Sequence, residues 1–297
     1  MESFFASLPD SSGGLSPLAQ IAASDAPVLI LGEAGTGRSV FARLLHAAGP
    51  RAAAPLVELD PAAVPAALFE SELFGYGAGA FTGAEQSRPG RVARAQGGTL
   101  VLDHVEELPL ASQPKLLRLL AEHRYAPLGG DEALADVRFV AIGAHDLTAR
   151  VGQGLFRSDL FFRLEVLNVL LPPLRARGPE LSGLIATMLA DLGERFARPG
   201  LELSARAASW MKHYSWPGNL RQLRNVLERA MLLADGRVLD PPPPEPAAAA
   251  PSSLAEAERT AILAALSASR GHQGKAAAML GISRKGLWEK RKRHAIP

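Results

Sequence analysis

The sequence predicts an α/β domain with a mainly parallel sheet, followed by a helical subdomain and a small all-α module. Three observations lead to this fold class. Short apolar runs alternate with helical patterns in the first part of the chain, apolar residues recur only at helical spacing from about Arg177 to Ala234, and a proline-rich stretch precedes a basic tail of about 46 residues.

The alternating segments define the expected sheet. The predicted strands are Val28–Leu31, Leu56–Leu59, Thr99–Asp103 and Val137–Ile142, and the clearest helical patterns between them are Val40–Ala47 and Lys115–His123. Strands that alternate with helices build a parallel sheet, because each helix carries the chain back to the starting edge. In the following subdomain, the helical spacing is seen at Leu184, Met188, Leu192 and Phe196.

Composition and charge narrow the class of protein. The chain has no cysteine, so it has neither a disulfide framework nor a thiolate metal site, which fits the cytoplasm. The longest apolar runs, such as Val166–Leu171, are far shorter than the roughly 20 residues of a membrane span, and the N-terminus does not resemble a signal peptide. We therefore expect no membrane contact.

The basic charge is concentrated at one end of the chain. Residues 252–297 contain nine Lys/Arg and three Asp/Glu, so this segment carries +6 and the remainder −4. Such a distribution favours a tail that binds nucleic acid over an acidic body that does not. Charge alone is equally compatible with an ordinary solvated basic helix.

The proline-rich stretch sets the predicted domain boundaries. Asp240–Pro246, four alanines and Pro251 cannot form a core and should make an extended spacer. We expect an α/β core at residues 1–176, a helical lid at 177–239, the linker at 240–251 and a helix-turn-helix domain at 252–297. Residues 1–25 offer only a short lead-in, so we expect no separate sensory domain.

A glycine-rich loop follows the first predicted strand and opens a helix. Its residues are Gly32, Glu33, Ala34, Gly35, Thr36, Gly37, Arg38 and Ser39. Glycines let backbone N–H groups turn toward an anion, so this layout predicts a phosphate cradle. Arg38 stands where the strict pattern has lysine, and a planar guanidinium does not substitute simply for a compact ammonium. The alternative is a merely structural turn.

A second element completes the expected phosphate site. The apolar strand Thr99–Leu102 ends in Asp103, which together with the Ser39 hydroxyl would hold Mg²⁺. Between the two elements lies the run Gly79, Ala80, Phe81, Thr82, Gly83 and Ala84, which by composition alone is a flexible exposed turn.

Gly79–Ala84 matches the GAFTGA loop of sigma-54-dependent transcriptional activators, and the chain resembles that family over nearly its whole length. Phe156–Leu164 is similar to the family's arginine-finger segment, and Trp216–Asn225 is similar to the lid motif with the second sensor arginine. The resemblance implies an AAA+ P-loop NTPase core with a helical lid, which binds ATP and Mg²⁺ and acts in a ring.

The resemblance also assigns roles to residues. Arg157 and Arg163 would reach the nucleotide of a neighbouring subunit, and Arg221 the nucleotide of its own subunit, because guanidinium groups stabilise charge on phosphate oxygens. Gly79–Ala84 would contact the sigma factor, with Phe81 and Thr82 at the moving tip. These arginines could otherwise be ordinary surface residues.

Four positions around the expected site of ATP hydrolysis depart from the family pattern. Arg38 replaces lysine, His104 replaces the glutamate after Asp103, Asp60 replaces an asparagine after the second strand, and Gly143-Ala144 replaces the first-sensor Thr-Asn. The missing glutamate matters most, since that carboxylate would polarise the attacking water.

Two explanations of these departures compete. In the first, the domain keeps its fold and nucleotide binding but hydrolyses slowly or not at all. In the second, Asp60 orients His104, which serves as the base near neutral pH. A chain with weak hydrolysis could still join a mixed ring in which a paralogous activator supplies the missing carboxylate.

The tail resembles a Fis-type helix-turn-helix. Ser253 and Glu256 can form a capping box for its first helix, whose apolar face would include Leu254, Ala261, Ile262, Ala265 and Leu266. Gly281 makes the turn and Ser283 caps the recognition helix. The DNA-binding candidates are Ser283, Arg284, Lys285, Trp288, Lys290 and Arg291. The alternative is a three-helix tail with a purely structural role and no DNA binding.

The leading hypothesis is therefore a sigma-54-interacting activator that binds upstream DNA, assembles as dimers or hexamers and uses ATP with Mg²⁺. A second hypothesis is a DNA-binding regulator that binds nucleotide or a paralogous subunit without efficient turnover. A regulator that acts without sigma-54 is disfavoured by the intact Gly79–Ala84 loop.

Overall fold

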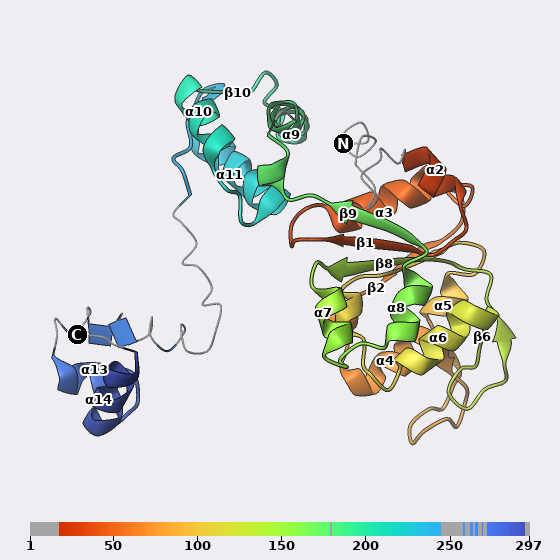
Figure 1. Cartoon of the computed structure of the whole chain (residues 1–297). Coiled ribbons are helices and arrows are strands. Elements are labelled where there is room, and N and C mark those ends of the chain that lie inside the picture. The colour runs from red at the N-terminus through yellow and green to blue at the C-terminus, as the bar shows by residue number, and fades with distance from the viewer. Residues whose placement is uncertain are drawn as a thin grey trace. The chain divides into compact units, whose positions relative to one another are not determined.

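The structure is a computed structural model that describes residues 18–178, 180–244, 258, 262–263, 265–266, 269 and 272–294. Its contacts divide the chain into two compact units, Met1–Pro243 and Pro244–Pro297. The two units are described separately below (Figure 1).

The first unit is built on a five-stranded parallel sheet, which confirms the predicted fold class. The strands are β1 (Val28–Gly32), β2 (Leu56–Leu59), β5 (Thr99–Leu102), β8 (Arg138–Ala144) and β9 (Leu167–Leu171), in the spatial order β2-β5-β8-β1-β9. All residues of β1 and β5 are buried. Continuous apolar runs of this kind are expected where helices cover both faces of a parallel sheet.

Two apolar clusters cover the two faces of the sheet. Alternate residues of β1 point into different clusters: Val28 and Ile30 pack with Phe41, whereas Leu29 packs with Phe69 and other residues of the opposite face. In Figure 1, α2 (Leu18–Ala23) and α3 (Arg38–Ala47) lie on one face of the sheet. The opposite face carries α4 (Ala66–Phe74), α5 (Arg91–Arg94), α6 (Gln113–Glu122) and α8 (Ser158–Leu164).

Short elements connect the strands and helices. They are the 3₁₀ turns η1 (Pro61–Ala63), η2 (Val105–Glu107) and η3 (Leu174–Ala176), the helix α7 (Leu147–Gly152), and the two-residue strands β3 (Gly75–Tyr76), β4 (Arg88–Pro89), β6 (Arg124–Tyr125) and β7 (Ala133–Leu134). β3 pairs with β4 and β6 with β7, both antiparallel.

The helical subdomain follows η3 and packs into the same apolar cluster as α3. Its helices are α9 (Leu181–Arg195), α10 (Ala205–His213) and α11 (Asn219–Leu233). A two-stranded parallel sheet, β10 (Glu202–Leu203) with β11 (Val238–Leu239), was not expected there, because two-residue strands leave no periodic pattern. Trp216 is fully buried, and its Nε1–H donates to the Met211 oxygen at 2.9 Å.

The second unit contains α13 (Gln273–Met279) and α14 (Arg284–Arg293). Ile262, Ala265, Ala276, Ala277 and Leu287 form its buried cluster. Gly281 adopts a φ of +65°, and the Ser283 hydroxyl accepts from the Gly286 N–H at 3.0 Å, so the predicted turn and cap are both present. The proposed capping box of Ser253 and Glu256, with Leu254 and Ala261, lies outside the described residues.

Within the described parts of the chain, none of the helices has both the length and the apolar composition needed to cross a bilayer.

Candidate functional site

The glycine-rich loop joins β1 to α3 and adopts a backbone that only glycine favours at two positions. Gly35 and Gly37 have φ values of +80° and +96°. A Cβ atom at Gly35 would collide with the Gly218 oxygen, so the loop and the helical subdomain approach each other backbone to backbone. The loop therefore depends on its glycines for both its turn and its contact with the subdomain.

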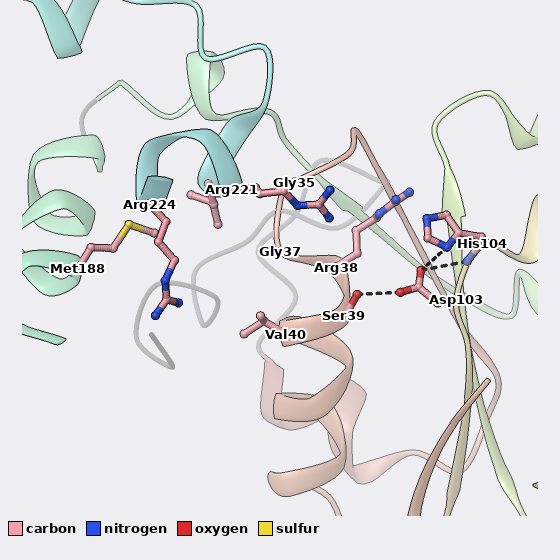
Figure 2. Close-up of a pocket in the computed structure, with 11 residues that line it drawn as sticks. Gly35, Gly37, Arg38, Ser39, Val40, Asp103, His104, Met188, Arg221 and Arg224 are labelled. Carbon is pink, nitrogen blue, oxygen red and sulfur yellow. Dashed lines mark hydrogen bonds and ion pairs between the residues drawn. The ribbon is translucent and has the colours of Figure 1, made fainter. Parts of the chain in front are cut away.

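A cavity of about 230 Å³ opens beside this loop. It is lined by residues from the loop, from the end of β5 and from the helical subdomain (Figure 2). The lining residues are Gly35, Gly37, Arg38, Ser39, Val40, Asp103, His104, Met188, Leu220, Arg221 and Arg224. The fold thus gathers most of the predicted phosphate-site residues around one space.

Ser39 and Asp103 meet at this cavity, as the sequence predicts. The Ser39 hydroxyl donates to the Asp103 carboxylate at 2.8 Å, and both side chains are partly buried. A hydroxyl and a carboxylate are ligands that Mg²⁺ prefers. Among the described residues, no three His, Asp or Glu side chains are grouped to hold a metal ion alone. A cation here would therefore need further oxygen ligands from water or from a bound phosphate.

Arg38 does not extend freely into the cavity. Its Nη1 group donates to the Gly32 oxygen at 3.0 Å and also to the Gly143 oxygen, and only 9% of the residue is exposed. These two carbonyl groups lie near the carboxyl ends of the neighbouring strands β1 and β8. The arginine that replaces lysine therefore joins two strands of the sheet.

His104 and Asp60 are hydrogen-bonded to each other. The His104 Nδ1 atom lies 3.1 Å from Asp60 Oδ1 and 3.8 Å from Asp103 Oδ1. Since a carboxylate only accepts, Nδ1 carries the proton of this bond, and in the neutral imidazole Nε2 is then an acceptor. His104 has a φ of +50° at the start of η2, and Asp60 also accepts from the Ala62 N–H at 2.9 Å. Both partners are thus held in place by the backbone turns around them.

The end of β8 carries no polar side chain, because Gly143 and Ala144 are its last two residues. A residue that the sequence analysis did not single out contacts this strand end: Glu106 is 7% exposed, and its carboxylate accepts from the Ala144 N–H at 3.1 Å. Two side chains therefore hold this strand end: Arg38 binds the Gly143 carbonyl group, and Glu106 binds the Ala144 N–H.

The helical subdomain is hydrogen-bonded to the glycine loop through Asn219. This residue is fully buried at the start of α11, with a φ of +49°. Its side-chain amide donates to the Ala34 oxygen at 3.0 Å and accepts from the Leu174 N–H at 2.8 Å. The Leu220 N–H donates to the Gly35 oxygen at 2.9 Å. The lid motif therefore forms the contact between the subdomain and the loop.

Glu33 reinforces the same contact. Arg175 of η3 donates to both of its carboxylate oxygens, and the Asn219 amide lies 3.3 Å from one of them. The hydrogen bond from Arg175, and then that from Asn219, lowers the pKa of Glu33 below its usual value. Glu33 therefore belongs to the contact between the glycine-rich loop, η3 and α11, and it is not a free side chain of the cavity.

Arg221 and Arg224 line the cavity from the first two turns of α11, and both are exposed. Arg221 was predicted from the lid motif, whereas Arg224 was quoted in that motif without a role. Arg157 and Arg163 do not line this cavity. Arg157 pairs with Asp159 at 2.8 Å on the surface, and Arg163 donates to the Leu120 oxygen at 3.1 Å.

The Gly79–Ala84 loop stands on the small antiparallel pair of β3 and β4. The Gly79 N–H donates to the Ala84 oxygen at 2.7 Å, which closes the tip. Phe81 at the tip is 47% exposed and contacts Tyr76 edge to face, with ring centroids 4.9 Å apart. At the base, the Gly77 N–H donates to the Leu128 oxygen at 2.9 Å. The loop thus has an exposed aromatic tip on an anchored base.

In the second unit, α14 presents Arg284, Lys285 and Trp288 to solvent. Trp288 is 57% exposed, and the Lys292 Nζ atom lies 5.5 Å from its ring centroid. Lys290 and Arg291 are only partly exposed, and Lys290 forms an ion pair with Glu258 inside the unit. The hydrogen bond from Lys290, followed by that from His294, lowers the pKa of Glu258 to about 2.

Models of known protein families match three consecutive segments of the chain. The sigma-54 interaction domain matches residues 10–170, the AAA+ ATPase lid domain matches residues 175–257, and the bacterial regulatory protein, Fis family, matches residues 253–294. The first of these covers more than half of the chain. This chain belongs to the sigma-54 interaction domain family.

Curated relatives of this sigma-54 family member align over most of its length. It is 41% identical to the alginate biosynthesis transcriptional regulatory protein AlgB of Pseudomonas aeruginosa over 97% of the chain, and 39% identical to the regulatory protein AtoC of Escherichia coli over 94%. The alignments cover 66% and 64% of those relatives, so the chain spans slightly less than two thirds of their length.

Solved structures agree with this family assignment. The crystal structure of NtrX from Brucella abortus in complex with ADP matches with a TM-score of 0.70 and 29% identity, over 94% of this chain and 67% of that one. NtrX in complex with ATP matches with the same TM-score. A chain of Hsp104 with 16% identity, a TM-score of 0.55 and coverage of 70% of this chain and 40% of that one supports the fold alone.

Proposed function

We propose that this chain is a sigma-54-interacting transcription regulator that binds DNA through its second unit and a nucleotide through its first. The observation that carries the proposal is that one compact unit holds both the glycine-rich cavity and the anchored hairpin with Phe81 at its exposed tip. Family membership and the relatives' names as regulators support the DNA and sigma-factor partners.

The nucleotide would be ATP with Mg²⁺, as NtrX structures with ADP and ATP suggest for this fold. Gly32–Gly37 offers backbone N–H groups to phosphate oxygens, Ser39 and Asp103 fit Mg²⁺, and Arg221 faces the same cavity. Bound ATP would supply the phosphoanhydride whose hydrolysis releases energy. The chain's own residues hold the phosphates, orient the cation and close the cavity with the helical lid.

Slow turnover is the form of this function that the geometry favours. The residue directly after Asp103 is His104 and not a carboxylate, and the buried Glu106 is engaged with the Ala144 N–H and is absent from the cavity lining. A carboxylate that polarises water is therefore missing from the described lining at this position. Nucleotide binding would then set the conformation of the lid and the Gly79–Ala84 loop without efficient hydrolysis.

A second candidate, a working ATPase with a rearranged centre, is supported by one contact. Asp60 Oδ1 lies 3.1 Å from His104 Nδ1, so in the neutral ring Nε2 is an acceptor at a residue that lines the cavity. Such a nitrogen could orient a water molecule. On this hypothesis, both His104→Ala and Asp60→Asn would reduce phosphate release to background.

The decisive experiment is phosphate release by the purified chain, with and without DNA that carries its binding site. One outcome is that the wild-type chain releases phosphate only at the background rate, whereas an Arg38→Lys/His104→Glu double variant releases it faster. This outcome supports the binding-only function and an intact scaffold. Measurable release by the wild-type chain that both single variants abolish supports the second candidate. Turnover that is unaffected by His104→Ala and Asp60→Asn contradicts both.

We also propose that subunits assemble, either with each other or with a paralogous activator in a mixed ring. Exposed apolar side chains lie close in sequence to Arg157 and Arg163: Leu155 is 54%, Phe162 is 70% and Val166 is 52% exposed. Exposed apolar side chains in this segment fit a surface that another subunit covers. Co-expression with a paralogue, followed by native mass spectrometry, tests this, and a chain that stays monomeric with nucleotide and partner refutes it.

A further inference from the structure

The cavity contains three arginines, and only one of them is committed to the protein's own backbone. Arg38 donates from one nitrogen to both the Gly32 and the Gly143 oxygens, and it is almost fully buried. If this guanidinium turned toward a phosphate, its hydrogen bonds to two carbonyl groups at the ends of β1 and β8 would be lost. Losing buried hydrogen bonds from a charged donor is costly. Arg38 therefore has a structural task that competes with ligand binding.

The other two arginines have no such commitment. Arg221 and Arg224 are exposed, they line the cavity from α11, and neither forms an ion pair with another described residue. Figure 2 shows Arg224 beside Met188 on the lid side of the cavity, across the glycine loop from Asp103 and His104. The positive charge available to an anion therefore comes from the lid.

The position of these lid arginines is fixed by the contacts at the start of α11. Asn219 and Leu220 are hydrogen-bonded to Ala34 and Gly35 of the glycine loop, and Glu33 is paired with Arg175. Arg221 and Arg224 follow directly in the first two turns of the same helix. The loop thus sets where the lid cations lie.

We propose that Arg224, together with Arg221, holds the phosphate groups of a nucleoside di- or triphosphate, and that Arg38 is an internal brace of the sheet. This inference rests on the proposed nucleotide binding. It assigns a binding role to Arg224 and transfers the task of the glycine loop's usual cation to the lid. Nucleotide affinity then depends on the lid contact at Asn219.

The test is equilibrium binding of fluorescently labelled ADP and ATP, with Mg²⁺, to the purified full chain. Arg224→Ala should weaken binding roughly tenfold, the scale of one charge-assisted contact. Arg229→Ala is the matched control, because Arg229 is an exposed arginine of the same helix that does not line the cavity. It should bind as the wild type does.

The second arm tests the brace. Arg38→Gln should lower the unfolding temperature of the nucleotide-free chain, an effect that a residue acting only on bound phosphate does not have. If this variant does not fold, the Arg224 arm still decides the binding role. Two outcomes overturn this inference and leave the proposed nucleotide binding standing. The first is wild-type affinity in Arg224→Ala. The second is an unchanged unfolding temperature in Arg38→Gln together with lost nucleotide binding. Absence of binding by the wild type would remove the proposed nucleotide function as well.

Discussion

The side-chain amide of Asn219 lies 3.0 Å from the backbone oxygen of Ala34, so a residue of the lid is hydrogen-bonded to the glycine-rich loop. The same side chain accepts from the Leu174 N–H, which lies in the hinge between the sheet and the lid. This one side chain therefore connects the glycine-rich loop, the segment before the lid and the lid itself. We expect a ligand that displaces the loop to act on the lid through these two hydrogen bonds.

Asn219→Ala should reduce the free energy of unfolding by about 1–3 kcal/mol, because the buried Leu174 N–H loses its acceptor. The substitution also places alanine at a φ of +49°, which adds strain. Denaturant unfolding followed by circular dichroism measures the change. Asn225→Ala, an exposed asparagine of the same helix, is the control and should be neutral. Equal stability of the two variants would contradict the role given to Asn219.

Phe81→Ala should abolish binding to the sigma factor while leaving the unfolding temperature nearly unchanged. The side chain is half exposed and contacts Tyr76 edge to face, so its removal creates no fully buried cavity. Binding is measured by surface plasmon resonance on immobilised sigma-54. Leu110→Ala, another exposed apolar substitution, should bind normally. Retained binding by Phe81→Ala would show that the tip is not the contact.

The sheet was largely predictable because its strands are continuous apolar runs that end next to glycine or acidic residues. β1, β2, β5 and β8 were all identified this way. β9 was missed: the run from Val166 to Leu171 was judged only as too short to cross a membrane. Its partner is β1, which lies far earlier in the sequence, so no local pattern indicates the pairing.

The contact between Ser39 and Asp103 was predictable, because Ser39 lies at the start of α3 after the glycine-rich loop and Asp103 directly follows β5. The Asp60–His104 contact also followed from the joint departure of two positions from the family pattern. In contrast, the contacts of Arg38 with Gly143 and of Glu106 with Ala144 depend on the direction of side chains between neighbouring segments. Sequence spacing does not specify those directions, and the sequence analysis therefore assigned Arg38 to the phosphates.

Lys285→Ala should weaken DNA binding at all sequences and reduce the slope of log affinity against log salt by about 1. Lys285 is exposed on α14 and forms no ion pair with another described residue, so its charge is available to a phosphate. Fluorescence anisotropy with duplex DNA at several salt concentrations gives the slope. Lys212→Ala, which removes an exposed lysine of the lid, should leave it unchanged. A slope unaffected by Lys285→Ala would place this side chain away from the backbone of the DNA.

Glu258→Gln should destabilise the second unit in a pH-dependent way. The pKa of Glu258 is lowered to about 2 by Lys290 and His294, so its ion pairs stabilise the folded state above the ordinary glutamate value near 4.5. This stabilisation declines as the pH falls from about 4.5 toward 2. Calorimetry of both full-length chains should show their largest difference at neutral pH and almost none near pH 2. A difference that is constant with pH would exclude the ionised pair as its source.

The most direct test of the whole account is the binding of sigma-54 RNA polymerase to this chain in different nucleotide states. Gel filtration of the chain with polymerase and target DNA, without nucleotide and with ATP and Mg²⁺, should show a complex that requires nucleotide. The complex should be lost in Thr82→Ala. A complex that forms equally without nucleotide, or no complex in either state, would contradict the claim that the cavity controls the Gly79–Ala84 loop.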